Sequence, residues 1–120
     1  MTVENILKDI LCDILDIDLS DIEPETYLIR DLDAESIDLL ELAVNINQQF
    51  NTSVNEDDLF LRKLRFYLEE AEERGIEKNS YLKNKYPFLP NDRIMEILDD
   101  IEKGPVLKMK DLIHYVTRQN

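Results

Sequence analysis

The sequence has a single cysteine, a single histidine, two glycines and no tryptophan in 120 residues. One cysteine cannot form an internal disulfide, which is the usual situation in a reducing compartment. No apolar stretch is long enough to span a bilayer. The first residues, MTVEN, also lack the basic flank and apolar core of a signal peptide. We therefore expect a soluble, cytoplasmic chain without a membrane span.

The sequence also lacks the patterns of an enzyme active site. It has no glycine-rich phosphate loop and no metal-ligand motif, and no nucleophile is paired with a base. Cys12 and His114 show no motif-like pairing, and a lone histidine without carboxylate or cysteine neighbours is more often structural than catalytic. We expect no catalytic residue and no metal site, and an enzyme is the least favoured class of function.

Basic residues are scarce in the first half of the chain. The whole sequence carries 14 basic and 27 acidic residues, a net charge of −13. Residues 1–61 contain 16 acidic residues against only Lys8 and Arg30, whereas residues 62–120 contain 11 acidic and 12 basic residues. Such an acidic half repels nucleic acid and steers encounters with basic protein surfaces. We expect protein partners and no nucleic acid; the alternative is a solvated surface that maintains solubility.

Apolar periodicity predicts an all-α chain. The length suits one domain, residues 1–120, and 43% hydrophobic residues suffice for a core. Apolar residues recur at helical spacing, and the predicted helices span residues 3–15, 36–50, 55–75, 91–104 and 109–118. Seven apolar residues of the long connection 17–35 are spaced to hold it against the helices: Ile17, Leu19, Ile22, Tyr27, Leu28, Ile29 and Leu32. Residues 77–90 are interpreted as a polar, lysine-rich stretch followed by a bent aromatic segment.

Ser36 stands at the centre of the stretch Asp31-Leu-Asp-Ala-Glu-Ser-Ile-Asp-Leu-Leu-Glu-Leu42. A serine directly before an apolar-periodic run is expected at a helix N-cap, beside backbone N–H groups that have no partner inside the helix. Two interpretations follow. Ser36 either only caps the helix, or presents its hydroxyl for covalent modification.

This stretch resembles the prosthetic-group site of the acyl carrier protein family, whose pattern is D-L-G-x-D-S-L-D-x-x-E-L. The likeness extends back to Tyr27-Leu-Ile-Arg-Asp31, forward through Ala43-Val-Asn-Ile46 and Phe50-Asn-Thr-Ser-Val54, and returns in residues 109–116. It covers residues 1–61 and 105–120 and omits 62–104. The resemblance implies a four-helix acyl-carrier-like bundle in which a helical pair, residues 62–104, is inserted between the third and fourth family helices.

The resemblance implies that Ser36 carries 4′-phosphopantetheine, attached by a phosphopantetheinyl transferase. The chain would be a stand-alone carrier, itself not an enzyme, that holds acyl intermediates as thioesters for fatty-acid, lipid or related biosynthesis. Its partners would be the transferase and acyl-transferring or acyl-modifying enzymes with basic docking surfaces, and we expect a monomer. The alternative is a non-carrying interaction module on the same bundle.

The second predicted helix has a candidate partner-binding face. Ile37, Leu40 and Val44 lie at helical spacing away from the predicted core stripe, with Asp38 and Glu41 beside them. The resemblance assigns recognition to this face, and we include Glu35, which stands where the family usually has aspartate. Other departures are Ile37 for leucine, Asn47-Gln48-Gln49 for an acidic helix end, and Asp33 for a common glycine. Asp33 restricts the turn if that position requires a positive φ.

The aromatic residues of the inserted region and its flanks have three open interpretations: Phe60, Phe66, Tyr67, Tyr81, Tyr86 and Phe88. They fill a second small core, which is the commonest role of such residues. Alternatively they line a pocket for an unusual acyl chain, or the lysines and arginines around them form a second docking site.

Overall fold

The computed structural model describes residues 2–119, and these form helices without a β-strand. The α-helices are α1 (Val3–Leu15), α2 (Ser36–Phe50), α3 (Glu56–Leu59), α4 (Leu64–Arg74), α5 (Lys78–Lys85), α6 (Asn91–Asp100) and α7 (Met109–Gln119). Two short 3₁₀ helices, η1 (Leu19–Asp21) and η2 (Ile101–Lys103), lie between them. The all-α prediction is confirmed. None of the helices in residues 2–119 is long and apolar enough to cross a membrane.

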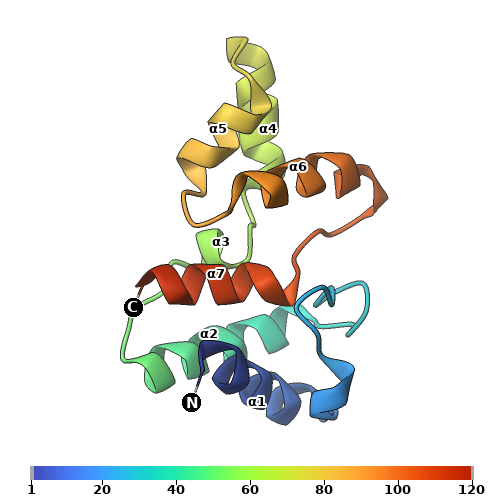
Figure 1. Ribbon diagram of the computed structural model, residues 1–120, viewed down its shortest axis with the longest axis vertical. Helices are drawn as coiled ribbons and strands as arrows, with labels where there is room; N and C mark the ends of the chain where they lie inside the picture. Colours follow the sequence, from blue (N-terminus) through green and yellow to red (C-terminus); the bar gives the residue numbers. More distant parts are fainter. Residues whose placement is uncertain (1, 120) are drawn as a thin grey trace.

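The helices are stacked along an elongated molecule (Figure 1). α1 and α2 pack together at one end, α7 crosses beside them, and the α4–α5 hairpin forms the opposite end, with α6 between it and α7. The buried core runs from α1 and α2 through α7, because each of these helices buries one apolar stripe. Its fully buried members include Leu7, Leu11, Leu42, Ile46, Met109, Leu112 and Val116.

The first, second and last predicted helices are confirmed as α1, α2 and α7. The predicted helix 55–75 is wrong, because it is broken into α3 and α4 by residues 60–63. Leu61 there has a φ of 54°, a left-handed conformation that ends a helix. At this break, the side chains of Phe60 and Leu61 are buried in the core. Their burial stabilises the left-handed backbone conformation of Leu61, which is unfavourable for a leucine by itself.

A third helix lies in the region where the sequence predicted a pair. α5 forms over residues interpreted as a polar stretch, so residues 62–104 contain α4, α5 and α6. α5 has almost no amphipathic pattern and buries only Tyr81 and Leu82. Its position depends on packing against α4 and α6 and not on its own periodicity.

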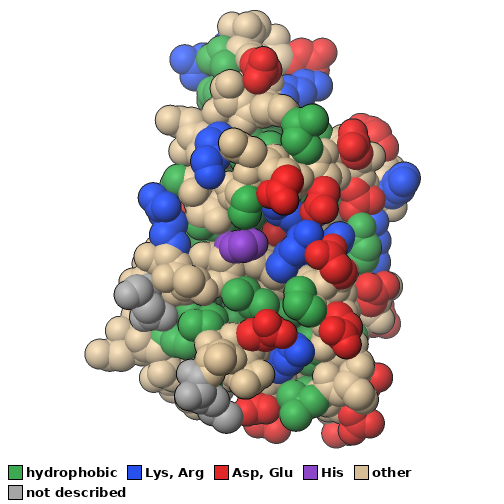
Figure 2. Space-filling model, viewed as in Figure 1, with side chains coloured by type: hydrophobic (Ala, Val, Ile, Leu, Met, Phe, Trp, Pro, Cys, Tyr) green, Lys and Arg blue, Asp and Glu red, His purple; other side chains and the backbone are tan. Residues whose placement is uncertain are grey.

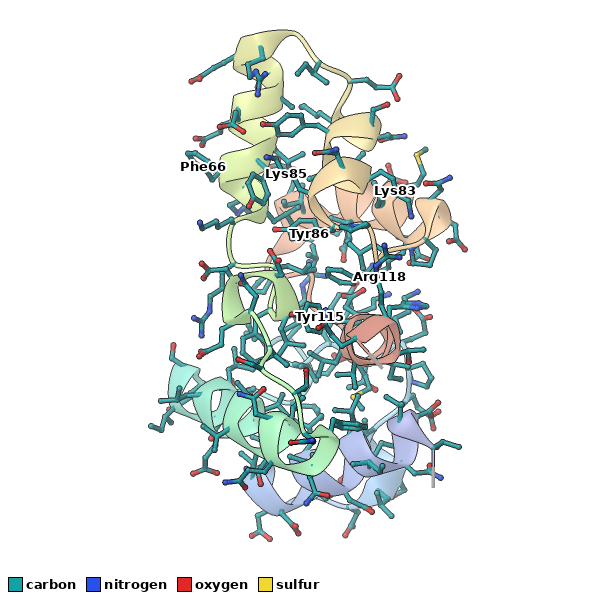
Figure 3. All side chains as sticks on the ribbon, turned by 90° about the vertical axis from the view of Figure 1, so that its left-hand side faces the viewer. Phe66, Lys83, Lys85, Tyr86, Tyr115 and Arg118 are labelled. Carbon is teal, nitrogen blue, oxygen red and sulfur yellow. The ribbon has the colours of Figure 1, made fainter. Side chains whose placement is uncertain are left out.

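Aromatic rings join the α4–α5 hairpin to α7. Tyr67, Tyr86, Phe88 and Tyr115 make successive edge-to-face contacts, with ring centroids 5.6, 5.9 and 5.1 Å apart. Figure 3 shows Tyr86 at the base of the hairpin, above Tyr115 of α7. Phe66 points away from the body on the outer side of α4 (Figure 3) and is exposed. The aromatic residues of this region thus mainly form a core, as the commonest of the three interpretations predicts.

Ion pairs fasten the same helices to the rest of the chain. Arg93 of α6 and Asp111 of α7 form a fully buried pair with two contacts of 2.7 and 2.8 Å. Arg30, in the connection before α2, pairs with Asp100 at the end of α6 at 2.9 Å. Ile22 and Leu28 anchor that connection in the core, but the prediction for Leu19 is wrong, since this side chain is 53% exposed.

Candidate functional site

The segment that leads to Ser36 is a tightly hydrogen-bonded turn. The Asp33 N–H donates to the Ile29 carbonyl at 3.1 Å, and the Ala34 N–H donates to the Leu28 carbonyl at 3.0 Å. The Asp31 carboxylate accepts the Tyr27 N–H at 2.9 Å. These bonds satisfy backbone groups within the turn, so the position of the following helix start is defined by the chain itself.

Asp33 adopts a φ of 59° within this turn. That is the left-handed region, which costs most residues about 1–2 kcal/mol and which aspartate tolerates better than most. The turn therefore does require a positive φ at Asp33, the position at which the family commonly has glycine.

Ser36 is the first residue of α2, and Glu35 is its N-cap. The predicted N-cap role of Ser36 is therefore wrong by one residue. Asp38 explains the shift, because its carboxylate accepts the Glu35 N–H at 2.8 Å and so closes the first turn without a contribution from serine. The Ser36 side chain is exposed, and its hydroxyl has no hydrogen-bond partner within residues 2–119. The hydroxyl is thus not used for capping.

The start of α2 offers donors beside this hydroxyl. Across residues 2–119, the backbone N–H groups of Ser36 and Ile37 have no acceptor. Free N–H groups and the positive end of the helix dipole favour an anion at this position. An exposed hydroxyl with such neighbours fits a phosphodiester attached through the serine oxygen.

The predicted partner-binding face lies on the exposed side of α2. Ile37, Leu40 and Val44 are 62%, 47% and 47% exposed. Glu35 and Glu41 are also exposed, whereas Asp38 is half-buried and serves as a capping residue. The predicted core stripe consists of Leu39, Leu42, Ala43, Ile46 and Phe50. Its first four members are buried on the other side of the same helix, whereas Phe50 is half-buried. Five of the six predicted face residues therefore lie on α2, and the sixth, Glu35, is the N-cap directly before it.

Acidic side chains are unevenly distributed on the surface. On the face shown in Figure 2, they predominate around α1 and the segment after it, whereas acidic and basic side chains are mixed over the inserted helices. The excess of acidic residues in the first half of the sequence is therefore also visible on this face.

The remaining candidate groups show no catalytic arrangement. Burial, followed by the charges of Asp9 and Asp13, raises the pKa of the Cys12 thiol, so this half-buried group is a poor nucleophile. Within the described part of the chain, no group of three or more His, Cys, Asp or Glu side chains is placed to hold a metal ion.

The sequence did not predict the long-range hydrogen bonds that hold the segment before Ser36 in place. The Leu28 N–H donates to the Leu107 carbonyl at 3.1 Å, and the Arg30 guanidinium donates to the Gly104 carbonyl at 2.9 Å. More than 70 residues separate these partners. No local pattern marks such pairs, although an arginine in an otherwise acidic half is a signal that it has a specific partner.

Comparison with known proteins places these features in a family context. The model of the phosphopantetheine attachment site matches residues 5–63. The acyl carrier protein of Nitratidesulfovibrio vulgaris (strain DP4) is 34% identical over 58 residues, which are 48% of this chain and 76% of that protein. The acyl carrier protein of Chlamydia caviae is 34% identical over 58 residues, 48% of this chain and 75% of the relative.

One relative matches a longer part of the chain. The acyl carrier protein of Cyanophora paradoxa is 27% identical over 89 residues, 74% of this chain and 82% of its own length. No solved structure gives a significant match to the chain.

Proposed function

The chain belongs to the acyl carrier protein family, and we propose that Ser36 is the residue that carries its 4′-phosphopantetheine. Members of this family are carriers and not enzymes, and their arm is attached at the site that residues 5–63 match. The observation that supports Ser36 is its exposed hydroxyl, free of hydrogen bonds within residues 2–119, at the first position of α2.

Attachment would be a phosphoryl transfer catalysed by a phosphopantetheinyl transferase. The Ser36 oxygen forms a bond to phosphorus of coenzyme A, the pyrophosphate bond breaks, and adenosine 3′,5′-bisphosphate leaves while the hydroxyl proton passes to the transferase. The backbone N–H groups of Ser36 and Ile37, which have no acceptor within residues 2–119, would donate to the phosphodiester. When bound, the arm supplies a thiol that holds acyl groups as thioesters.

We further propose that the chain acts as a stand-alone, monomeric cytoplasmic carrier, in a single domain of residues 1–120, for fatty-acid, lipid or related acyl biosynthesis. Its lone cysteine suits a reducing compartment. The alternative function is an interaction module that uses the same bundle without an arm, and it predicts no loading at Ser36.

A loading experiment separates the two functions. The protein is incubated with coenzyme A, magnesium and a broad-specificity phosphopantetheinyl transferase, and its intact mass is measured. We expect the mass of one arm on the parent chain and on Ser53→Ala, a matched exposed-serine control, and none on Ser36→Ala. Failure of the parent with several transferases would favour the interaction module.

The partner-binding face is proposed to consist of Glu35, Ile37, Asp38, Leu40, Glu41 and Val44. Exposed apolar side chains ringed by acids suit a cleft with basic edges. We expect Leu40→Arg to lower kcat/KM for loading about 10-fold or more, which corresponds to about 1.4 kcal/mol. Met95→Arg, at a similarly exposed apolar residue on α6, should leave it unchanged. Equal losses for both variants would contradict this assignment.

A further inference from the structure

The end of the inserted region contacts the segment that leads to Ser36. Arg30 of this segment donates from one terminal guanidinium nitrogen to the Asp100 carboxylate at 2.9 Å. The other terminal nitrogen donates to the Asp100 carbonyl at 3.2 Å and to the Gly104 carbonyl at 2.9 Å. Asp100 is the last residue of α6, and Gly104 directly follows η2. Three hydrogen bonds therefore fasten one side chain of the segment to residues that the inserted region supplies.

Tyr27 binds the same carboxylate. Its hydroxyl donates to the second oxygen of the Asp100 carboxylate at 2.5 Å, so both oxygens have a partner. The Arg30 guanidinium also lies 4.2 Å from the centre of the Tyr27 ring, where the aromatic face attracts a cation. The Arg30 and Asp100 side chains are only 21% and 15% exposed, so salt screens this pair less than a surface pair. We refer to Tyr27, Arg30, Asp100 and Gly104 as the junction.

Glycine at position 104 allows the close approach of Arg30. Gly104 has a φ of 134°, a conformation that residues with a side chain rarely adopt. A Cβ atom at this position would lie 3.3 Å from the Arg30 Nε atom. Any larger residue would therefore strain the backbone and displace the guanidinium that binds the Gly104 carbonyl.

The junction is connected to Ser36 by the turn of residues 27–34. The carbonyls of residues 27–29 each accept at least one N–H group from the second half of the turn. The last of these bonds ends two residues before Ser36. Tyr27 and Arg30, both in the first half of the turn, are the residues that the inserted region holds. Fixing them therefore restricts the path of the chain up to Ser36.

The turn is unfavourable by itself, because Asp33 adopts a left-handed conformation within it. Segments with a local cost of this kind open more readily when tertiary contacts are removed. Loss of the junction should therefore increase the fraction of molecules in which the turn is open.

We propose that Asp100 and Gly104 of the inserted region are positioning residues for the loading of Ser36 and that they act through Arg30. The inference rests on the proposed function at Ser36. A transferase that binds only the ordered turn has an apparent affinity reduced by the fraction of molecules in which the turn is ordered. Once the complex has formed, the turn is ordered and the phosphoryl transfer is unaffected. Loss of the junction should therefore raise KM for the carrier and leave kcat unchanged.

Two carboxylates on α6 provide a matched pair of variants. Asp100→Ala removes the junction, whereas Glu96→Ala, one turn earlier on the same helix, removes a carboxylate that accepts from Lys110 at 2.8 Å and makes no hydrogen bond to residues 27–34. Loading is measured at several concentrations of the full-length carrier. We expect KM to rise about 10-fold in Asp100→Ala with kcat within about twofold of the parent, and neither value to change in Glu96→Ala.

A double-variant cycle shows whether Asp100 acts through Arg30. Adding Asp100→Ala to Arg30→Met should not raise KM beyond the value for Arg30→Met alone, because the junction is already lost. Gly104→Ala should also raise KM, since its Cβ displaces the same guanidinium. This variant provides an independent test if Asp100→Ala folds poorly.

Amide hydrogen exchange measured by NMR reports on the turn without a transferase. The Asp33 and Ala34 N–H groups donate within the turn, and we expect both to exchange about 10-fold faster in Asp100→Ala than in the parent. Their exchange in Glu96→Ala should equal that of the parent. Leu112, buried in α7, should keep its exchange rate in both variants, because the change is local.

Three outcomes would overturn the inference and leave the proposed function intact. The first is a KM in Asp100→Ala equal to that of the parent or of Glu96→Ala. The second is a lower kcat, or a further rise in KM when Asp100→Ala is added to Arg30→Met, which would indicate direct contact between Asp100 and the transferase. The third is unchanged exchange of the Asp33 and Ala34 amides. Absence of any mass gain at Ser36 in the parent would instead overturn the proposed function, and this inference with it.

Discussion

At the scale of single residues, two buried tyrosines differ in how their hydroxyls are satisfied. Tyr86 is completely buried, and its hydroxyl has no partner within the described residues; burial raises the pKa of this group. The Tyr115 hydroxyl accepts the Asn55 N–H at 2.9 Å. Because an unpaired buried hydroxyl costs free energy, Tyr86→Phe should leave the free energy of unfolding unchanged or raise it by up to about 1 kcal/mol. Tyr115→Phe should lower it by about 1 kcal/mol. Urea denaturation measures both, and a larger loss for Tyr86→Phe would contradict this account.

Glu25 links stability to pH. Hydrogen bonds from Lys108 and then Lys110, both at 2.8 Å, lower the pKa of its carboxyl to about 2. A pKa below the unfolded value of about 4.3 stabilises the fold above that pH, and the contribution is lost as pH falls towards 2. The side chain is 64% exposed, so we expect Glu25→Gln to cost less than about 1 kcal/mol at pH 7 and nothing below pH 2. Urea unfolding across this range measures the difference, with Glu23→Gln as the control, because the exposed Glu23 side chain forms no ion pair within residues 2–119.

At the scale of elements, the buried pair of Arg93 and Asp111 decides how α6 docks on α7. Asp111 also accepts the Lys108 N–H at 2.9 Å, so its carboxylate serves both helices. Removing one member leaves a buried charge unpaired, and Asp111→Ala should therefore lower the free energy of unfolding by about 3–5 kcal/mol. Asp99→Ala, at an exposed residue of α6 that forms no ion pair with any of residues 2–119, should stay within about 0.5 kcal/mol. The double change Arg93→Leu, Asp111→Leu should cost less than Asp111→Ala alone; a greater cost would show that packing, not charge, dominates here.

At the scale of the whole molecule, the concentration of acidic residues in one half should govern the rate of partner encounter. Exposed charges are screened beyond about 10 Å at 0.1 M salt, so loading of Ser36 by a transferase with a basic surface should slow several-fold between about 0.05 and 0.5 M salt. Glu41→Lys on α2 should reduce the low-salt rate and flatten this dependence. Glu72→Lys makes the same charge change on α4 and should do neither. Identical salt profiles for both variants would exclude steering by the α2 face.

Strong local patterns account for the parts of this structure that could be predicted. α1, α2 and α7 each bury one stripe at helical spacing, so periodicity alone located them. The outward position of Ile37, Leu40 and Val44 followed from the same geometry. The break at Leu61, the helix α5 and the exposure of Leu19 did not follow, since each depends on contacts with residues distant in the chain.

The candidate site was likewise predicted only in part from the sequence. The acidic stretch and its serine placed the site within one residue of the helix start. Local propensity could not decide between Glu35 and Ser36 as N-cap, because the Asp38 carboxylate makes the bond that closes the first turn.

By itself, the amino-acid sequence determined the helical class, the segregation of charge and the serine at the start of a helix, because these depend on residues close together in the chain. Only the tertiary structure decided that α6 docks on α7 and that an apolar groove lies beside the segment that leads to Ser36. Ion pairs such as Arg30–Asp100, with partners 70 residues apart, and the aromatic contacts between the hairpin and α7 bring those surfaces together. Such pairings arise from the shape of the folded chain, which no local pattern of residues encodes.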